Sequence, residues 1–143
     1  MIYLTSNTQS TVTVTLQENA ISVNPYYAWN IVNIETNASI VFCADDYSPY
    51  PCNYNQFTFS VVSIASNGTA TGSTNGTIYA NAGVYNYAVF EMNTQYDLNL
   101  NNSVGIVEKG LLTITGTYTP YTVNTANDNM VIVVNQSLNY NDQ

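Results

Sequence analysis

The chain has almost no positive charge. Its 143 residues include one lysine, Lys109, no arginine and no histidine, against nine aspartates and glutamates. Proteins that bind nucleic acids or anionic membranes need several basic residues to neutralise phosphates, so we expect neither partner. Without histidine, Ser-His-Asp and Cys-His catalytic arrangements and histidine-ligated metal sites are impossible. Paired carboxylates can also perform acid–base catalysis, so these absences do not exclude an enzyme, but we expect that the protein is not one.

Long apolar runs are also missing. No run approaches the roughly 18 residues that a membrane-spanning helix requires. The first ten residues, MIYLTSNTQS, have neither the basic nor the apolar part of a signal peptide, so we expect none.

The sequence contains few groups with the spacing of metal ligands. Asp45 and Asp46 are adjacent, with Asn53 and Asn55 nearby. Calcium needs six to eight oxygen ligands, and this spacing matches no known calcium loop. We interpret the two aspartates as solvated loop residues, and we expect no metal or other cofactor.

Only two cysteines are present, Cys43 and Cys52, on either side of the octapeptide ADDYSPYP. The length of this loop permits a disulfide, and two free thiols fit a protein that assembles in the cytosol. Both interpretations stay open. No cationic neighbour is at hand to lower a thiol pKa, so we do not expect a cysteine nucleophile.

Alternating apolar and polar residues, which are typical of half-buried strands, recur along the chain. The predicted strands are residues 10–18, 25–35, 39–44, 56–65, 75–80, 83–92, 104–117 and 129–134, with a further short strand at 1–5. Turns rich in Asn, Gly, Ser and Pro separate them. This pattern predicts an all-β fold, an antiparallel immunoglobulin-like β-sandwich of seven to nine strands, with a barrel as the less favoured alternative.

The predicted domain covers residues 1–117, and residues 118–143 form a C-terminal extension. Residues 65–76, ASNGTATGSTNG, are expected to be an exposed loop. Gly110 interrupts the strand at 104–117 and suggests a bulge or tight bend there.

The stretch GVYNYAVFEM, residues 83–92, predicts part of the core. Gly83 allows a tight corner, and Tyr85 is expected to hydrogen-bond back to that corner, as tyrosines near the start of a late strand do in immunoglobulin-like domains. Tyr87 and Val89 follow at intervals of two and should face the core, with Trp29 as a packing partner. Carbohydrate binding by the tyrosines is the alternative, but strict alternation favours a buried face.

Five segments occur in an order that resembles a family of short tailed-phage proteins, found in crAss-like and related phages. The segments are NPYYAWNIVN (24–33), FCADDYS (42–48), YNQFTF (54–59), GVYNYAVFE (83–91) and VGIVEKGLLTITGT (104–117). The resemblance covers about residues 1–117. It implies an immunoglobulin-like virion protein of the head decoration or head-fibre kind, assembled in the host cytoplasm. The cysteines and residues 48–54 depart from the family pattern, and relatives carry more Lys and Glu.

Tyrosine-rich loops are the predicted contact regions, because tyrosine supplies a large and rigid contact area. The contact tyrosines are Tyr47, Tyr50 and Tyr54 in one loop, and Tyr118 and Tyr121 in another. In the apolar run at 130–134, Val131, Ile132 and Val133 are expected to pair with a sheet edge in an oligomeric partner or another virion protein. The alternative is that this run closes the sheet of its own domain.

The leading hypothesis is a non-enzymatic bacteriophage virion structural protein, a homo-oligomer that decorates the capsid or forms part of a head fibre. The alternative is a tail or fibre module that binds a host-surface glycan.

Overall fold

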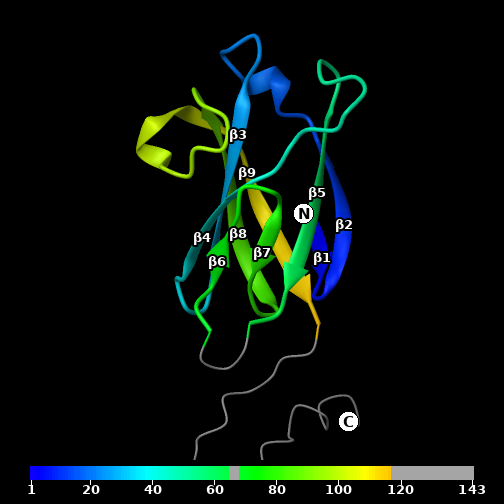
Figure 1. Ribbon diagram of the computed structural model, residues 1–143, viewed down its shortest axis with the longest axis vertical. Coiled ribbons are helices and arrows are strands. Elements are labelled where there is room, and N and C mark those ends of the chain that lie inside the picture. Colours follow the sequence, from blue (N-terminus) through cyan, green and yellow to red (C-terminus); the bar gives the residue numbers. More distant parts are fainter. Residues whose placement is uncertain (65–67, 117–143) are drawn as a thin grey trace, which may run out of the picture.

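The computed structural model describes residues 1–64 and 68–116 and shows an all-β protein (Figure 1). One sheet contains five strands in the order β1 (Ile2–Thr5), β9 (Ser103–Thr115), β8 (Gly83–Met92), β3 (Tyr26–Asn33) and β4 (Ser39–Cys43). The other sheet contains four, in the order β2 (Thr8–Val14), β5 (Asn55–Val62), β7 (Thr77–Tyr79) and β6 (Thr71–Gly72). Two 3-10 helices, η1 (Gln17–Asn19) and η2 (Leu100–Asn102), interrupt the loops. The nine strands of the described part fall within the predicted number.

Two sheets with a core between them are consistent with the predicted β-sandwich, but both sheets are mixed. β1 pairs in parallel with β9, and β5 pairs in parallel with β7. A tight hairpin joins only antiparallel strands. Neither parallel pair is joined by one, since β1 and β9 are far apart in sequence and a long segment containing β6 separates β5 from β7. The purely antiparallel arrangement was predicted from hairpin-like spacing, and it fails at these two pairs.

The core forms because alternate side chains of each strand point between the sheets. Trp29 on β3 lies at its centre and has no exposed surface. Its ring centroid is 5.4 Å from that of Phe57 and 5.0 Å from that of Phe59, both on β5. Tyr85, Tyr87 and Val89 on β8 are also buried, so all four residues expected in the core lie there.

Tyr85 connects the core to the corner that precedes β8. Its ring is buried, and its hydroxyl donates a hydrogen bond to the carbonyl oxygen of Asn81 at 2.8 Å. The acceptor lies four residues upstream of the donor. The bond thus fixes the chain where it enters the strand.

Gly110 has a different role from the predicted bulge. The irregularities of β9 fall at Val107 and Val104, which have no partner in the register with β8. Gly110 pairs with Tyr87, and a Cβ atom at Gly110 would lie 2.7 Å from the Tyr87 ring. The glycine therefore makes room for a tyrosine ring to cross the neighbouring strand.

The segment expected to be an exposed loop at 65–76 contains ordered structure in its second half. Thr71–Gly72 forms β6, and the Cys43 amide donates to the carbonyl of Ser73 at 2.8 Å. Gly72 lies against β4 so closely that a Cβ atom would be 2.1 Å from the Val41 carbonyl oxygen. The strand was not predicted because the segment has a low-complexity composition. In the sequence alone, a glycine that permits close backbone approach cannot be distinguished from a linker glycine.

The sandwich has two distinct ends (Figure 1). At one end, which we call the apex, lie residues 15–25, 44–54 and 93–102, which connect β2 to β3, β4 to β5 and β8 to β9. At the opposite end, the base, β9 finishes at Thr115, whose carbonyl accepts a hydrogen bond from the Ser6 amide at 2.7 Å. The Ser6–Asn7 turn leads directly into β2.

Candidate binding surface

The apex carries most of the strongly exposed apolar side chains of the described residues. Ile21 and Val23 are 79% and 88% exposed on the first loop, and Tyr47 and Tyr50 are 65% and 62% exposed on the second. Loops that carry such side chains on a rigid scaffold are typical binding regions. The apex is therefore the best candidate for a binding surface.

The first apical loop is held by a buried glutamate. Glu91 on β8 is 1% exposed, and its carboxylate accepts hydrogen bonds from the backbone amides of Ile21 at 2.8 Å and Ser22 at 2.7 Å. Although burial alone would raise it, these hydrogen bonds hold the pKa of Glu91 below its usual range. Two backbone amides thus serve as partners of the Glu91 carboxylate in place of a basic side chain.

The second apical loop is held by Asp46. Its Oδ1 accepts from the amides of Ser48 and Gln56, both at 2.9 Å, and its Oδ2 accepts from the side-chain amide of Asn55 at 2.7 Å. Buried Asn55 in turn accepts a hydrogen bond from the Leu16 amide at 2.8 Å, which joins the second loop to the first. Asp46 is an exposed loop residue, as predicted, and these hydrogen bonds give it the additional role of fixing the loop.

The third apical loop is held by Asp97. This carboxylate accepts from the Asn99 amide and from the side chain of Asn102, each at 2.8 Å. The two hydrogen bonds lower the pKa of Asp97, that of Asn102 most. With Glu91 and Asp46, each apical loop has its own carboxylate as an acceptor of hydrogen bonds.

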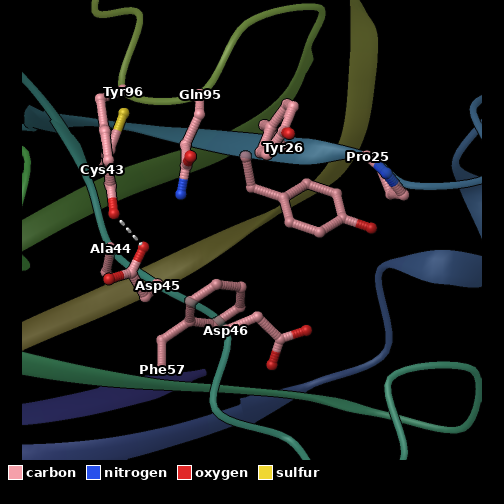
Figure 2. A pocket seen from close by; sticks show the side chains of 10 residues that line it. Pro25, Tyr26, Cys43, Ala44, Asp45, Asp46, Phe57, Gln95 and Tyr96 are labelled. Atoms are coloured by element: carbon pink, nitrogen blue, oxygen red, sulfur yellow. Dashed lines mark hydrogen bonds between the residues drawn. The ribbon is translucent and has the colours of Figure 1, made fainter.

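A tyrosine joins the second and third loops. The Tyr96 hydroxyl points at the Asp45 carboxylate and donates a hydrogen bond to its Oδ1 at 2.7 Å (Figure 2). This hydrogen bond raises the pKa of the Tyr96 hydroxyl, because it favours the protonated form.

A pocket of about 380 Å³ opens between these two loops and the start of β3. It is lined by Pro25, Tyr26, Tyr27, Cys43, Ala44, Asp45, Asp46, Phe57, Gln95 and Tyr96 (Figure 2). Its volume lies in the range of small-molecule sites, roughly 300–1,000 Å³. No cluster of three or more metal-ligating side chains occurs among residues 1–64 and 68–116.

The predicted contact tyrosines divide into two groups. Tyr47 and Tyr50 are exposed at the apex, and Tyr54 is half-buried there, with its ring centroid 6.5 Å from that of Tyr50. The remaining predicted contact residues lie outside the described residues, namely Tyr118, Tyr121, Val131, Ile132 and Val133.

The two cysteines are free thiols. Cys43 is buried at the end of β4 and Cys52 is exposed in the second apical loop. Burial, and to a smaller extent the charge of Asp97, raises the pKa of the Cys43 thiol to about 11. At neutral pH this thiol is protonated, so it is a poor nucleophile.

Several apical residues had not been predicted as site residues. Ile21 and Val23 belong to no strand pattern, and apolar residues in a loop next to Pro25 were the available signal. Gln95 and Tyr96 follow the long β8 strand and meet Asp45 only because β8 and β4 end at the same end of the sandwich. Contacts of this kind depend on the strand topology, so the local sequence pattern does not predict them.

Comparisons with known proteins identify no family. No protein-family model matches the chain, and no curated protein matches it. A solved structure described as "a putative glycoside hydrolase from Bacteroides vulgatus ATCC 8482" is similar at 10% identity and a TM-score of 0.36. The similarity covers 82% of this chain and 17% of that one, so this chain spans only a small part of its length. Separately, the described residues contain no helix with the length and apolar character needed to span a bilayer.

Proposed function

We propose that the protein is a non-enzymatic structural component of a bacteriophage virion, which decorates the capsid or forms part of a head fibre through protein–protein contacts. The observation that carries this proposal is the apex, where exposed apolar side chains project from loops fixed by internal hydrogen bonds. Ile21 is an example in the first loop, which is fixed by hydrogen bonds to Glu91 on β8. Tyr50 is an example in the second loop, which is fixed by hydrogen bonds to Asp46. A loop that is already ordered loses less entropy on binding, so its contacts yield more affinity.

The resemblance of residues 1–117 to phage head proteins supports a location in the virion, reached after assembly in the host cytoplasm. The charge distribution is compatible with this role. Glu91, Asp45, Asp46 and Asp97 accept hydrogen bonds from backbone and side-chain donors at the apex. Lys109 on β9 is the one lysine or arginine of the chain. Contacts to a partner would then rest on apolar and hydrogen-bonding groups.

We also propose an immunoglobulin-like fold as the finer description of the sandwich. The order β9-β8-β3-β4 corresponds to the G-F-C-C′ order of immunoglobulin domains, and the pairing of β2 with β5 corresponds to strands B and E. The hydrogen bond from Tyr85 to Asn81 is the bond of a tyrosine corner. The order departs from this scheme at β6 and β7, which follow β5 in the chain.

Assembly into a homo-oligomer is proposed to use strand addition at β2. Within the described ranges β2 is an edge strand that pairs only with β5, and it contains neither lysine nor proline to discourage further pairing. Residue Gly116 lies beside Ser6, at the turn that leads into β2. The apolar run at 130–134 of another copy is the proposed added strand.

Virions purified to homogeneity and analysed by quantitative mass spectrometry test the virion proposal. We expect hundreds of copies per particle for a decoration protein, and a few to some dozens for a fibre component. A double variant, Val23→Ser with Tyr50→Ala, should reduce incorporation, whereas Tyr3→Ala on the outer face of β1 should not. Absence of the protein from virions would overturn the proposal.

A tail or fibre module that binds a host-surface glycan is the second candidate function. The pocket between the second and third apical loops favours it, because the pocket combines the aromatic rings of Tyr26 and Tyr96 with the carboxylate of Asp45. Copy number separates a tail location from a head location, and ligand binding to the isolated protein tests the pocket independently.

A further inference from the structure

The apical pocket contains a hydroxyl that the fold leaves without a partner. Tyr27 on β3 is 6% exposed and lines the pocket, yet its hydroxyl oxygen is buried and makes no hydrogen bond with any described residue. Buried polar groups nearly always have a partner, and leaving one unsatisfied weakens folding. Ser6 Oγ and Trp29 Nε1 are likewise buried without a partner, but neither of these residues lines the pocket, whereas Tyr27 does. An acceptor that reaches the Tyr27 hydroxyl from the pocket would supply the missing partner.

The phenol is a hydrogen-bond donor across the physiological range. Burial, and then the negative charges of Glu91 and Asp46, raise its pKa above the ordinary value, so it stays protonated. The expected complement is an oxygen with a lone pair, such as a hydroxyl or a ring oxygen.

Two other residues of the pocket lining offer free hydrogen-bonding capacity. Asp45 uses Oδ1 to accept from Tyr96, and its Oδ2 accepts no hydrogen bond from the described part of the chain. The Gln95 side chain points into the pocket from the loop after β8, and it makes no side-chain hydrogen bond within residues 1–64 and 68–116 (Figure 2). The lining of the pocket therefore includes a carboxylate acceptor, an amide and a phenol donor.

Three further residues of the lining are aromatic. Tyr26 is 42% exposed and Tyr96 is 44% exposed, and both line the pocket together with the ring of Phe57. Aromatic rings offer apolar faces to weakly polarised C–H groups, while ligand hydroxyls reach the polar groups at the edges. A ligand that fits must have apolar faces and several hydroxyls at its rim.

Charge limits the ligand further. Asp45 and Asp46 line the pocket, and Lys109, the one lysine or arginine of the chain, lines a different groove on the outer face of the five-stranded sheet. An anionic ligand such as a phosphate, a uronic acid or a sialic acid would meet like charge with no cation to offset it.

We propose that the apical pocket binds one or two units of an uncharged saccharide. One sugar hydroxyl donates to Oδ2 of Asp45, a sugar oxygen accepts from the Tyr27 hydroxyl, and a C–H face of the ring packs on Tyr26 or Tyr96. The amide of Gln95 makes a further hydrogen bond at the rim. This inference deepens the second candidate function and rests on it. Binding to the isolated protein tests it separately from the place of the protein in the virion.

The test uses the full-length protein and ligand-observed saturation-transfer NMR with glucose, galactose, mannose, N-acetylglucosamine, lactose and maltose, each at millimolar concentration. Glucuronic acid, sialic acid and a lysine-rich peptide serve as charged comparisons. We expect at least one neutral sugar to bind and the two acids to give no signal. No binding by any neutral sugar, or stronger binding of the acids or of the peptide, would overturn the proposal.

Variants make the test specific to the pocket. Tyr27→Phe removes only the unpartnered hydroxyl, so it should leave the melting temperature unchanged or raise it while weakening sugar binding by about 3- to 10-fold. Asp45→Asn should weaken binding at least as much. Tyr3→Phe, at a tyrosine 68% exposed on β1, is the matched control and should change neither property. Sugar binding that survives both pocket variants would place the ligand elsewhere and refute the assignment, whatever the outcome of the virion inventory.

Discussion

Tyr96 and Asp45, which lie 51 residues apart in sequence, are joined by a hydrogen bond of 2.7 Å from the phenol to the carboxylate. The bond connects the loop after β8 with the loop after β4 and closes one side of the apical pocket. It shows how a chain with one basic residue holds its loops: hydroxyls and amides replace the lysine and arginine partners that carboxylates commonly have.

Asp45→Asn should lower the pKa of Tyr96 toward its ordinary value, because the carboxylate acceptor that favours the protonated phenol is lost. A pH titration of the ring resonances by NMR measures this directly. Amide hydrogen exchange in residues 93–102 should also become faster. An unchanged Tyr96 pKa in the variant would show that the hydrogen bond does not form in solution.

Stability should fall as the pH drops below about 4.5, the ordinary pKa of a glutamate. The folded-state pKa values of Glu91 and Asp97 are lowered, so the unfolded chain binds protons more readily than the folded one in this range. The stabilisation is complete above the unfolded pKa values and is lost as the pH falls through the folded ones. Thermal unfolding followed by circular dichroism from pH 7 to pH 3 measures the loss.

Glu91→Gln provides the matched variant for this pH dependence. It should destabilise the protein at pH 7 by about 1–3 kcal/mol, since two buried amides lose a charged acceptor. The variant should also show a shallower loss of stability on acidification. Glu35→Gln, at an exposed residue in the β3–β4 turn, should leave both unchanged. An acid profile identical to that of the wild type would contradict the role of Glu91.

Gly110→Ala should destabilise the fold by about 1–3 kcal/mol, because the new methyl group would overlap the Tyr87 ring. Gly105→Ala on the same strand is the control. A Cβ atom there meets nothing within 4 Å, so stability should change by less than about 0.5 kcal/mol. Chemical denaturation of the two variants compares them, and equal stabilities would refute the close approach of Tyr87.

Trp29→Ala and Tyr85→Ala should each cost about 3–5 kcal/mol, because both rings are buried in the core. Tyr50→Ala removes an exposed ring and should change stability by less than about 0.5 kcal/mol. Denaturant titration measures all three. A Tyr85→Ala variant that unfolds like the wild type would contradict its place at the corner before β8.

Removal of residues 129–143 tests strand addition. A chain that ends at Asp128 should fold and should fail to assemble, as judged by circular dichroism and size-exclusion chromatography. A folded chain with unaltered assembly would defeat the idea. An unfolded chain would instead favour closure of the domain's own sheet by residues 130–134.

The sequence predicted the strands whose side chains alternate strictly. The predicted and observed limits of β8 coincide at residues 83–92, and Trp29, Tyr85, Tyr87 and Val89 lie in the core as their spacing implied. Alternation has a direct physical cause, since successive side chains of a strand point to opposite faces.

Features set by long-range geometry could not be predicted in this way. The parallel pairing of β1 with β9 depends on how residues 2–5 and 112–115, far apart in sequence, meet in the fold, and no local pattern encodes it. Glu91 continues the core-facing alternation of β8, and its function became visible only when Ile21 and Ser22 were seen to donate to it from 70 and 69 residues away. Gly110 was interpreted as a bulge because the reason for the glycine, the Tyr87 ring that lies against it, comes from another strand and is not visible in the local sequence.

A cryo-electron microscopy reconstruction of the intact virion tests the central claim most directly. We predict density for this domain in which the apical loops at 15–25 and 44–54 are buried against another virion protein. Density with the apex of every copy facing solvent and attachment through the base alone would contradict the claim, as would a virion that lacks the protein.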